Sequence, residues 1–135
     1  MDIIRGRAEN TQPTRLATDH FTGTVWVDPI VPVTAEGHLV VSVTFCPGAR
    51  SHWHSHTMGQ FLIVTSGLGW ICEHGGTPHD IRAGDVVWTP PGERHWHGAT
   101  PATVMTHTAI SIGRPEWFDE VIESDYLVGA DRRTS

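Results

Sequence analysis

Two short segments of the chain carry nitrogen and oxygen donors at spacings that suit a metal ion. His54 and His56 are separated by one residue, so on an extended strand both imidazoles point to the same face. Gln60 opens the next apolar run, and His95 lies in a second segment, GDVVWTPPGERHWHG at 84–98. Imidazole nitrogens with an amide oxygen suit a divalent transition metal, and Mn, Fe, Co, Ni and Zn are all compatible. These four residues are the predicted metal ligands.

Two further histidines are candidates for the chemistry beside the metal. In MTHTAIS at 105–111, His107 alternates with small and apolar residues, which indicates that it points into the protein interior. A neutral imidazole there could take and return a proton near neutral pH. The alternative is that His107 only orients a ligand. His97 has the same strand parity as His95 and is another pocket candidate.

His52 is the first histidine of the segment SHWHSH, and it alternates along the strand with His54 and His56, so the three share strand parity. It either lines the mouth of the site or, if the strand bulges after Gly48, faces away from it. It is therefore not counted among the metal ligands.

The elements that must position these residues are short β-strands. Gly and Pro interrupt the chain every eight to twelve residues, a spacing typical of sandwiches and barrels. The runs between them are rich in Val, Ile, Thr, Trp and Phe, and they span 24–30, 39–45, 61–66, 69–74, 85–90 and 102–112. Pro115 followed by acidic residues predicts a C-terminal helix over about 115–127. The first twenty residues carry no pattern and are assigned no element.

Composition limits the class of protein and its partners. The 135 residues suit one domain, 1–135, with a barrel over about 22–112. A formal charge of −6 and the lack of a basic run argue against nucleic acid or an anionic membrane as a partner. Cys46 and Cys72 lack metal-binding spacing, and the chain has no long apolar run or leader. Free thiols and a cytoplasmic location are expected.

The two donor segments together resemble the two motifs of the cupin superfamily. The first motif, with Gln in place of the usual Glu, is matched by Gly48, His54, His56, Gln60 and Gly67. The second is matched by Gly84, Pro90, Gly92 and His95, with Ala99 where an Asn is usual. This resemblance covers about residues 40–112. It implies an all-β double-stranded β-helix, or jelly-roll barrel, with the metal inside and a homo-oligomeric assembly, a dimer or tetramer.

Four stretches are similar to a narrower group, the bacterial manganese-dependent cupin hydroxynitrile lyases: FTGTVWVDP, PGARSHWHSHTMGQFLIVTSGLGW, AGDVVWTPPGERHWHGATP and MTHTAI. The resemblance implies Mn(II) as the metal and (R)-selective cleavage of cyanohydrins to an aldehyde and HCN. It places the catalytic base at His107 and a pocket hydroxyl at Ser51, where those enzymes have Thr. It also places Val41, Val43 and Ser111 at positions that line the pocket.

Gln60 in place of a carboxylate has a direct electrostatic consequence. Neutral imidazoles and a neutral amide leave the full positive charge of the ion, which favours an anionic ligand.

Other functions stay open at the level of sequence. A cupin barrel with this donor set could also be a metal-dependent dioxygenase, an oxo-acid lyase or decarboxylase, or a non-catalytic module that binds a small molecule.

Overall fold

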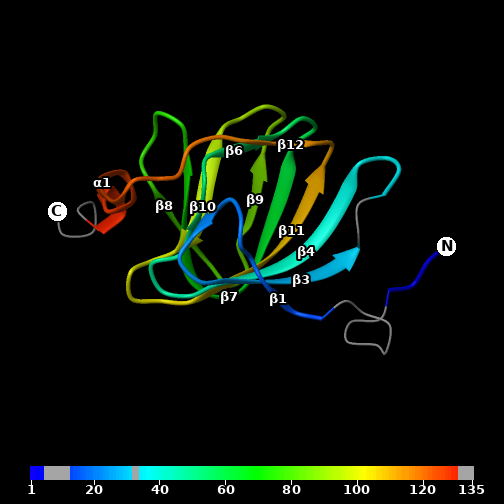
Figure 1. Cartoon of the computed structure of the whole chain (residues 1–135), viewed down its shortest axis with the longest axis horizontal. Coiled ribbons are helices and arrows are strands. Elements are labelled where there is room, and N and C mark those ends of the chain that lie inside the picture. The colour runs from blue at the N-terminus through cyan, green and yellow to red at the C-terminus, as the bar shows by residue number, and fades with distance from the viewer. Residues whose placement is uncertain (5–12, 32–33, 131–135) are drawn as a thin grey trace.

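The computed structural model describes residues 1–4, 13–31 and 34–130, and these form an all-β barrel with one short C-terminal helix (Figure 1). The strands are β1 (Arg15–Leu16), β2 (Phe21–Thr22), β3 (Val25–Val31), β4 (His38–Phe45), β5 (Arg50–Ser51), β6 (His54–His56), β7 (Gln60–Glu73), β8 (His79–Arg82), β9 (Val86–Thr89), β10 (His95–Ala99), β11 (Met105–Ile112) and β12 (Pro115–Trp117), and the helix is α1 (Glu123–Tyr126). The predicted barrel class is confirmed.

The long strand β7 joins two antiparallel sheets. Its first half pairs with β9 on one side and with β11 on the other, and the order continues through β4 and β3 to β1; we call this sheet 1. Its second half pairs with β8 and β10 of the other sheet, which also holds β2, β5, β6 and β12 and is called sheet 2. Gly67 lies where β7 passes between the sheets, with a φ of +80°. A Cβ there would overlap the carbonyl oxygen of Val104, so the crossing requires glycine.

The interior of the barrel is lined by alternate residues of the sheet 1 strands. In β11, every second residue from Met105 to Ser111 is buried and the residues between them are half-buried. In β4, Val43 and Phe45 are buried on the inner face, as the alternation of 39–45 predicts. The inner positions form an apolar core, and some of them also line a cavity.

The predicted helix over 115–127 is wrong in its first part. Residues 115–117 form β12, which pairs with β6 so that Trp117 lies opposite His54. The backbone N–H of Phe118 also donates to the carbonyl of Trp53. These long-range hydrogen bonds to an edge strand outweigh a local helix preference, which is worth only fractions of a kcal/mol per residue. The helix begins at Glu123.

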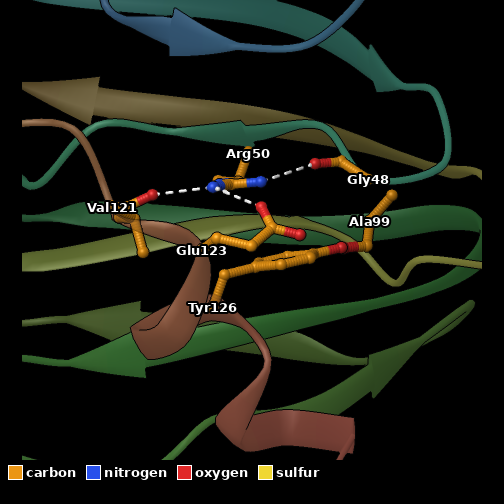
Figure 2. A network of polar contacts seen from close by, with 6 residues as sticks. All are labelled: Gly48, Arg50, Ala99, Val121, Glu123 and Tyr126. Carbon is orange, nitrogen blue, oxygen red and sulfur yellow. Dashed lines mark hydrogen bonds and ion pairs between the residues drawn. The ribbon is translucent and has the colours of Figure 1, made fainter.

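A polar network attaches the end of the chain to sheet 2 (Figure 2). The guanidinium of Arg50 donates to the carbonyl of Val121 over 2.8 Å and lies 4.3 Å from the ring centroid of Tyr126. It also pairs with the carboxylate of Glu123 over 3.3 Å. The Tyr126 hydroxyl donates to the carbonyl of Ala99 over 2.7 Å. The C-terminal segment is thus held against β5 and β10, two strands that carry site residues.

Part of the first twenty residues, which were assigned no element from the sequence, takes part in the fold as β1, and β2 follows directly after them. β1 pairs with β3, and β2 pairs with β5. His20, just before β2, has a φ of +68°, which is uncommon for a residue with a Cβ. Residues 5–12 lie outside the described part of the chain. Within the described residues, no helix is long and apolar enough to cross a membrane.

Candidate metal centre

A cavity of about 470 Å³ opens inside the barrel. The surface of its walls is mainly apolar, although Arg15, Asp19 and Arg114 also line it, and histidines from three strands gather at its inner end. The predicted site residues on its lining are Ser51, His54, His56, Gln60, His97 and His107, together with Val41, Val43 and Ser111. His95 is not on the lining and lies behind these side chains, only 1% exposed.

Three buried histidines come close enough to share one metal ion. One ring nitrogen from each of His54, His95 and His97 lies within 4.8 Å of the others. β6 and β10 supply them, and these strands pair with His54 opposite His95. Within the described residues this is the one cluster of His, Cys, Asp or Glu with such geometry. The three side chains could hold a metal ion.

Backbone carbonyls hold two of these rings in a fixed orientation. Nδ1 of His54 lies 2.9 Å from the carbonyl oxygen of His52, and Nδ1 of His95 lies 3.0 Å from that of Glu93. A neutral imidazole carries a single N–H, which these carbonyls place on Nδ1. Nε2 of both rings is then left with its lone pair, which is the form that binds a metal.

Gln60 directs its side-chain oxygen toward the same cluster of histidines. Its Nε2 donates to Oγ of Ser111 over 3.0 Å, which turns Oε1 toward Nε2 of His95 at 3.1 Å. Since the N–H of His95 is used at Nδ1, two lone-pair atoms face each other across this short distance. A cation bound by both atoms would remove that repulsion. The donor set therefore fits a metal ion.

His56 is buried beside this cluster. Its ring centroid lies 5.1 Å from that of His54, and neither ring nitrogen has a hydrogen-bond partner within the described residues. Burial lowers its pKa to about 4, with a further contribution from His95. Its nitrogens are not within the 4.8 Å group. A buried neutral imidazole with two unpaired nitrogens is available as a further ligand.

His97 and His107 form a hydrogen-bonded pair at the inner end of the cavity. Nδ1 of His97 lies 3.0 Å from Nε2 of His107, and both side chains are buried. Burial lowers the pKa of His107 to about 4, and burial with the neighbouring His107 lowers the pKa of His97 well below its usual value. The hydroxyl oxygen of Ser51 accepts the backbone N–H of His97 over 3.1 Å, which leaves its proton free to donate.

The whole site is short of negative charge. Burial lowers the pKa of His54 and His95 as well, so the histidines are neutral near pH 7. No Asp or Glu is buried within the described residues. A divalent cation bound here would keep its full charge, and an anion would be its natural further ligand.

Two parts of the cavity wall were not predicted from the sequence. Trp117, assigned to a helix from sequence, lies over His54 with 4.7 Å between ring centroids and is stacked on His20 at 4.3 Å. Residues 15–21 form another part of the wall. No local signal marks either segment, because each reaches the cavity through pairing with distant strands. His52 is not on the lining, and its ring lies 6.3 Å from that of His20.

Comparisons with known proteins agree with this architecture. The model of the Cupin domain family matches residues 41–110. An (R)-mandelonitrile lyase of Granulicella tundricola is 49% identical over 116 residues, covering 80% of this chain and 86% of that protein. The structure of a cupin-like protein from Thermotoga maritima superposes with a TM-score of 0.78 at 40% identity, covering 94% of this chain and 96% of the other. A predicted oxalate decarboxylase from Thermotoga maritima, at 21% identity and a TM-score of 0.70 over 84% of this chain and 100% of its own, shares the fold.

Proposed function

This chain belongs to the cupin domain family, and we propose that it is a metal-dependent lyase that cleaves (R)-cyanohydrins to an aldehyde and HCN. The observation that carries this proposal is a buried cluster of neutral histidines, without a buried carboxylate among the described residues, at the inner end of an apolar cavity. The 49% identity to an (R)-mandelonitrile lyase supports the same reaction. As a cupin, the chain is proposed to work as a homo-oligomer on a small-molecule substrate.

The proposed metal is one Mn(II) ion, although the donor types also suit Fe, Co, Ni or Zn. Its proposed ligands are His54, His56, Gln60 and His95. His54 and His95 each direct Nε2 into the cluster, and Gln60 directs Oε1. When bound, the ion would supply positive charge that stabilises the cyanide leaving group.

His107 is the proposed base. With a pKa of about 4 it is unprotonated near neutral pH, so it is free to accept the hydroxyl proton of a cyanohydrin. Nε2 of His107 is hydrogen-bonded to Nδ1 of His97, whereas Nδ1 of His107 has no hydrogen-bond partner within the described residues, so we assign the acceptor to Nδ1. As the proton leaves the hydroxyl, the oxygen forms the carbonyl of the aldehyde, the C–C bond to the nitrile breaks, and its electron pair leaves with cyanide. The proton held at Nδ1 of His107 then passes to cyanide, which leaves as HCN.

The cavity walls and Ser51 would orient the substrate. The aliphatic side chains of Leu39, Val41 and Val43 offer an apolar surface for the carbon substituent of a cyanohydrin. The free hydroxyl proton of Ser51 can donate to the substrate oxygen from the inner end of the cavity. Both contacts would place the substrate hydroxyl toward His107.

The test is cleavage of racemic mandelonitrile at mildly acidic pH, followed as benzaldehyde absorbance. Protein loaded with Mn(II) and protein stripped by a chelator are compared, and the remaining substrate is analysed on a chiral column. Cleavage that depends on the metal and consumes the (R)-enantiomer is expected. Protein that binds manganese but shows no rate above the buffer control would overturn the proposal.

A further inference from the structure

Sheet 1 carries a row of four residues that runs along the cavity wall from His107 to the edge of the sheet. Strand register places His107 of β11 opposite Val43 of β4, and Val43 opposite Val27 of β3. Val27 in turn lies opposite Arg15 of β1, and all four residues line the cavity. Residues opposite each other in antiparallel strands share one face of the sheet. The row therefore begins at the proposed base, crosses two valines and ends at a guanidinium.

The residues beside Arg15 show that it belongs to the inner face of sheet 1. Leu16, the next residue of β1, lies opposite Trp26, and these outward side chains are 48% and 41% exposed. Val25 and Val27, on either side of Trp26, are buried. Side chains alternate between the two faces of a strand, so Arg15 points inward with Val27. Because β1 is the edge strand of sheet 1, Arg15 is also exposed to solvent at the opening of the cavity (Figure 1).

The backbone that carries Arg15 is fixed on both sides. Before it, the hydroxyl of Thr14 donates to the carboxylate of Asp28. After it, the backbone N–H of Ala17 donates to the carbonyl of Val25 over 2.9 Å. A charged side chain on a backbone that is already ordered binds a ligand at a lower entropic cost than one on a mobile segment.

A second guanidinium lines the cavity where the chain passes from sheet 1 to sheet 2. Arg114 directly precedes β12, and its backbone N–H donates to Oγ1 of Thr57 over 2.8 Å. Asp19 is the one carboxylate on the lining among the described residues. Within that part of the chain, none of Arg15, Asp19 and Arg114 takes part in an ion pair. Two guanidiniums against one carboxylate give this lining a positive charge, in a chain of formal charge −6.

We infer that the substrate of this site carries a carboxylate at the end remote from its reacting carbon, and that Arg15 and Arg114 bind this carboxylate. The inference rests on the proposed lyase function and names its substrate class, a cyanohydrin whose carbon substituent ends in a carboxylate. The planar fork of N–H donors on an arginine matches the two oxygens of a carboxylate. A positive opening also draws an anionic substrate toward the cavity.

The spacing along the row determines how long such a substrate is. Three strand spacings of about 4.8 Å separate the backbones of His107 and Arg15, which is about 14 Å along the sheet. Both side chains extend into the cavity and shorten the gap between their charged or reacting atoms. The remaining gap suits a substituent of about one aromatic ring between the hydroxyl carbon and the carboxylate.

The side chains between the two ends of the row indicate what the middle of the substrate is. Val27 and Val43 are buried and offer no hydrogen bond, so the substituent beside them is hydrocarbon. His20 and Trp117, stacked with 4.3 Å between ring centroids, also lie on the lining and offer the face or edge of a ring. An aromatic ring that bears a carboxylate fits both walls.

Binding of two matched aldehydes tests this inference without the need for turnover. 4-Formylbenzoate carries the carboxylate, and 4-formylbenzamide replaces it with a neutral amide of nearly the same shape. By calorimetric titration at neutral pH, the wild type should bind the benzoate about tenfold more tightly, as hydrogen bonds to a charged group provide. Arg15→Gln and Arg114→Gln should each reduce this preference to about threefold, and the double variant should abolish it.

Protein loaded with Mn(II) and protein stripped by a chelator are both titrated, because a carboxylate can also coordinate a metal ion. The preference for the benzoate should be present in both forms. The matched control is Arg82→Gln, since Arg82 is an exposed arginine of β8 that does not line the cavity, and it should keep the full preference. Arg15→Lys should keep part of it, since the charge remains and the planar fork is lost. Circular dichroism checks that each variant folds.

A wild type that binds the benzoate no more tightly than the benzamide would overturn the inference, as would a preference that survives in the folded double variant. A preference that needs the metal but not Arg15 would place the carboxylate on the ion and would overturn it too. Cleavage of mandelonitrile, which has no carboxylate, judges the proposed reaction separately. A protein without lyase activity that still prefers the benzoate through Arg15 would overturn the reaction and support the carboxylate site.

Discussion

Oγ of Ser111 lies 3.0 Å from Nε2 of Gln60 and thereby sets which atom of the amide faces His95. Ser111 belongs to β11 and Gln60 to β7, and the two residues lie opposite each other in the sheet. A side chain that binds no metal itself therefore orients one proposed metal ligand.

Ser111→Ala should weaken Mn(II) binding. Without the hydroxyl the amide of Gln60 can rotate, and loss of such an outer partner typically costs about 10–100-fold in metal affinity. Isothermal titration of metal-free protein with Mn(II) measures the change. Ser66→Ala, at an exposed position of β7, is the control and should bind as the wild type does. Equal affinity in both variants would show that Ser111 does not position the amide.

The variants His56→Ala and His97→Ala distinguish between two possible sets of metal ligands. The proposed set includes His56, whereas the closest nitrogen cluster in the structure contains His97 with His54 and His95. His56→Ala should lose more metal affinity than the roughly 10–100-fold expected for an outer partner, and His97→Ala should lose less. Metal content after dialysis measures both. The reverse result would assign the third imidazole to His97.

His107→Ala should leave the bound manganese unchanged and lower kcat for mandelonitrile by about 10²–10⁴-fold, the usual contribution of a general base. His107 is fully buried and bonded to His97, so the fold of the variant is checked by its unfolding midpoint. His79→Ala, which removes an exposed histidine paired with Glu73, serves as the control. An unaltered kcat in the folded His107 variant would remove this residue from the mechanism.

Trp117→Ala should weaken metal binding through His54. The indole lies between the rings of His20 and His54, and each aromatic contact is worth about 0.5–1.5 kcal/mol. We expect a loss of about tenfold in Mn(II) affinity, with partial rescue in Trp117→Phe. Quenching of tryptophan fluorescence by added Mn(II) should also fall in both variants. Trp26→Ala, on the outer face of sheet 1, should leave affinity and quenching unchanged, and an equal response of the two positions would contradict this role.

The metal-free protein should lose stability as the pH falls from about 6.5 to about 4. Burial lowers the pKa of His56 and of His107 to about 4, so over this interval the unfolded chain binds more protons than the folded one. Stability therefore rises with pH, and each group contributes about 3 kcal/mol at neutral pH that is lost on acidification. Urea unfolding at a series of pH values measures the loss. A free energy of unfolding independent of pH in this interval would mean that both rings are solvated.

Much of the site could be predicted from the sequence because its signals are local. Strand periodicity alone places His54 and His56 on one face, and it aligns His95 with His97 and His107 with Ser111. The turn spacing predicts short strands, and the structure has them close to the expected positions, with two of the runs joined into β7. These features depend on the order of residues along one strand, which the sequence contains in full.

Only the tertiary structure decided how distant segments complete the site. The sequence of residues 115–117 predicts the start of a helix. In the structure these residues pair with β6, which places the ring of Trp117 against that of His54. The unpatterned residues 15–21 form part of the cavity wall. The alternation of side chains along a strand allows either His56 or His97 to point toward the metal. Only the pairing of β6 with β10 brings His97 into the close cluster with His54 and His95. Hydrogen bonds between strands far apart in the chain determine these contacts, and local residue preferences are too weak to predict them.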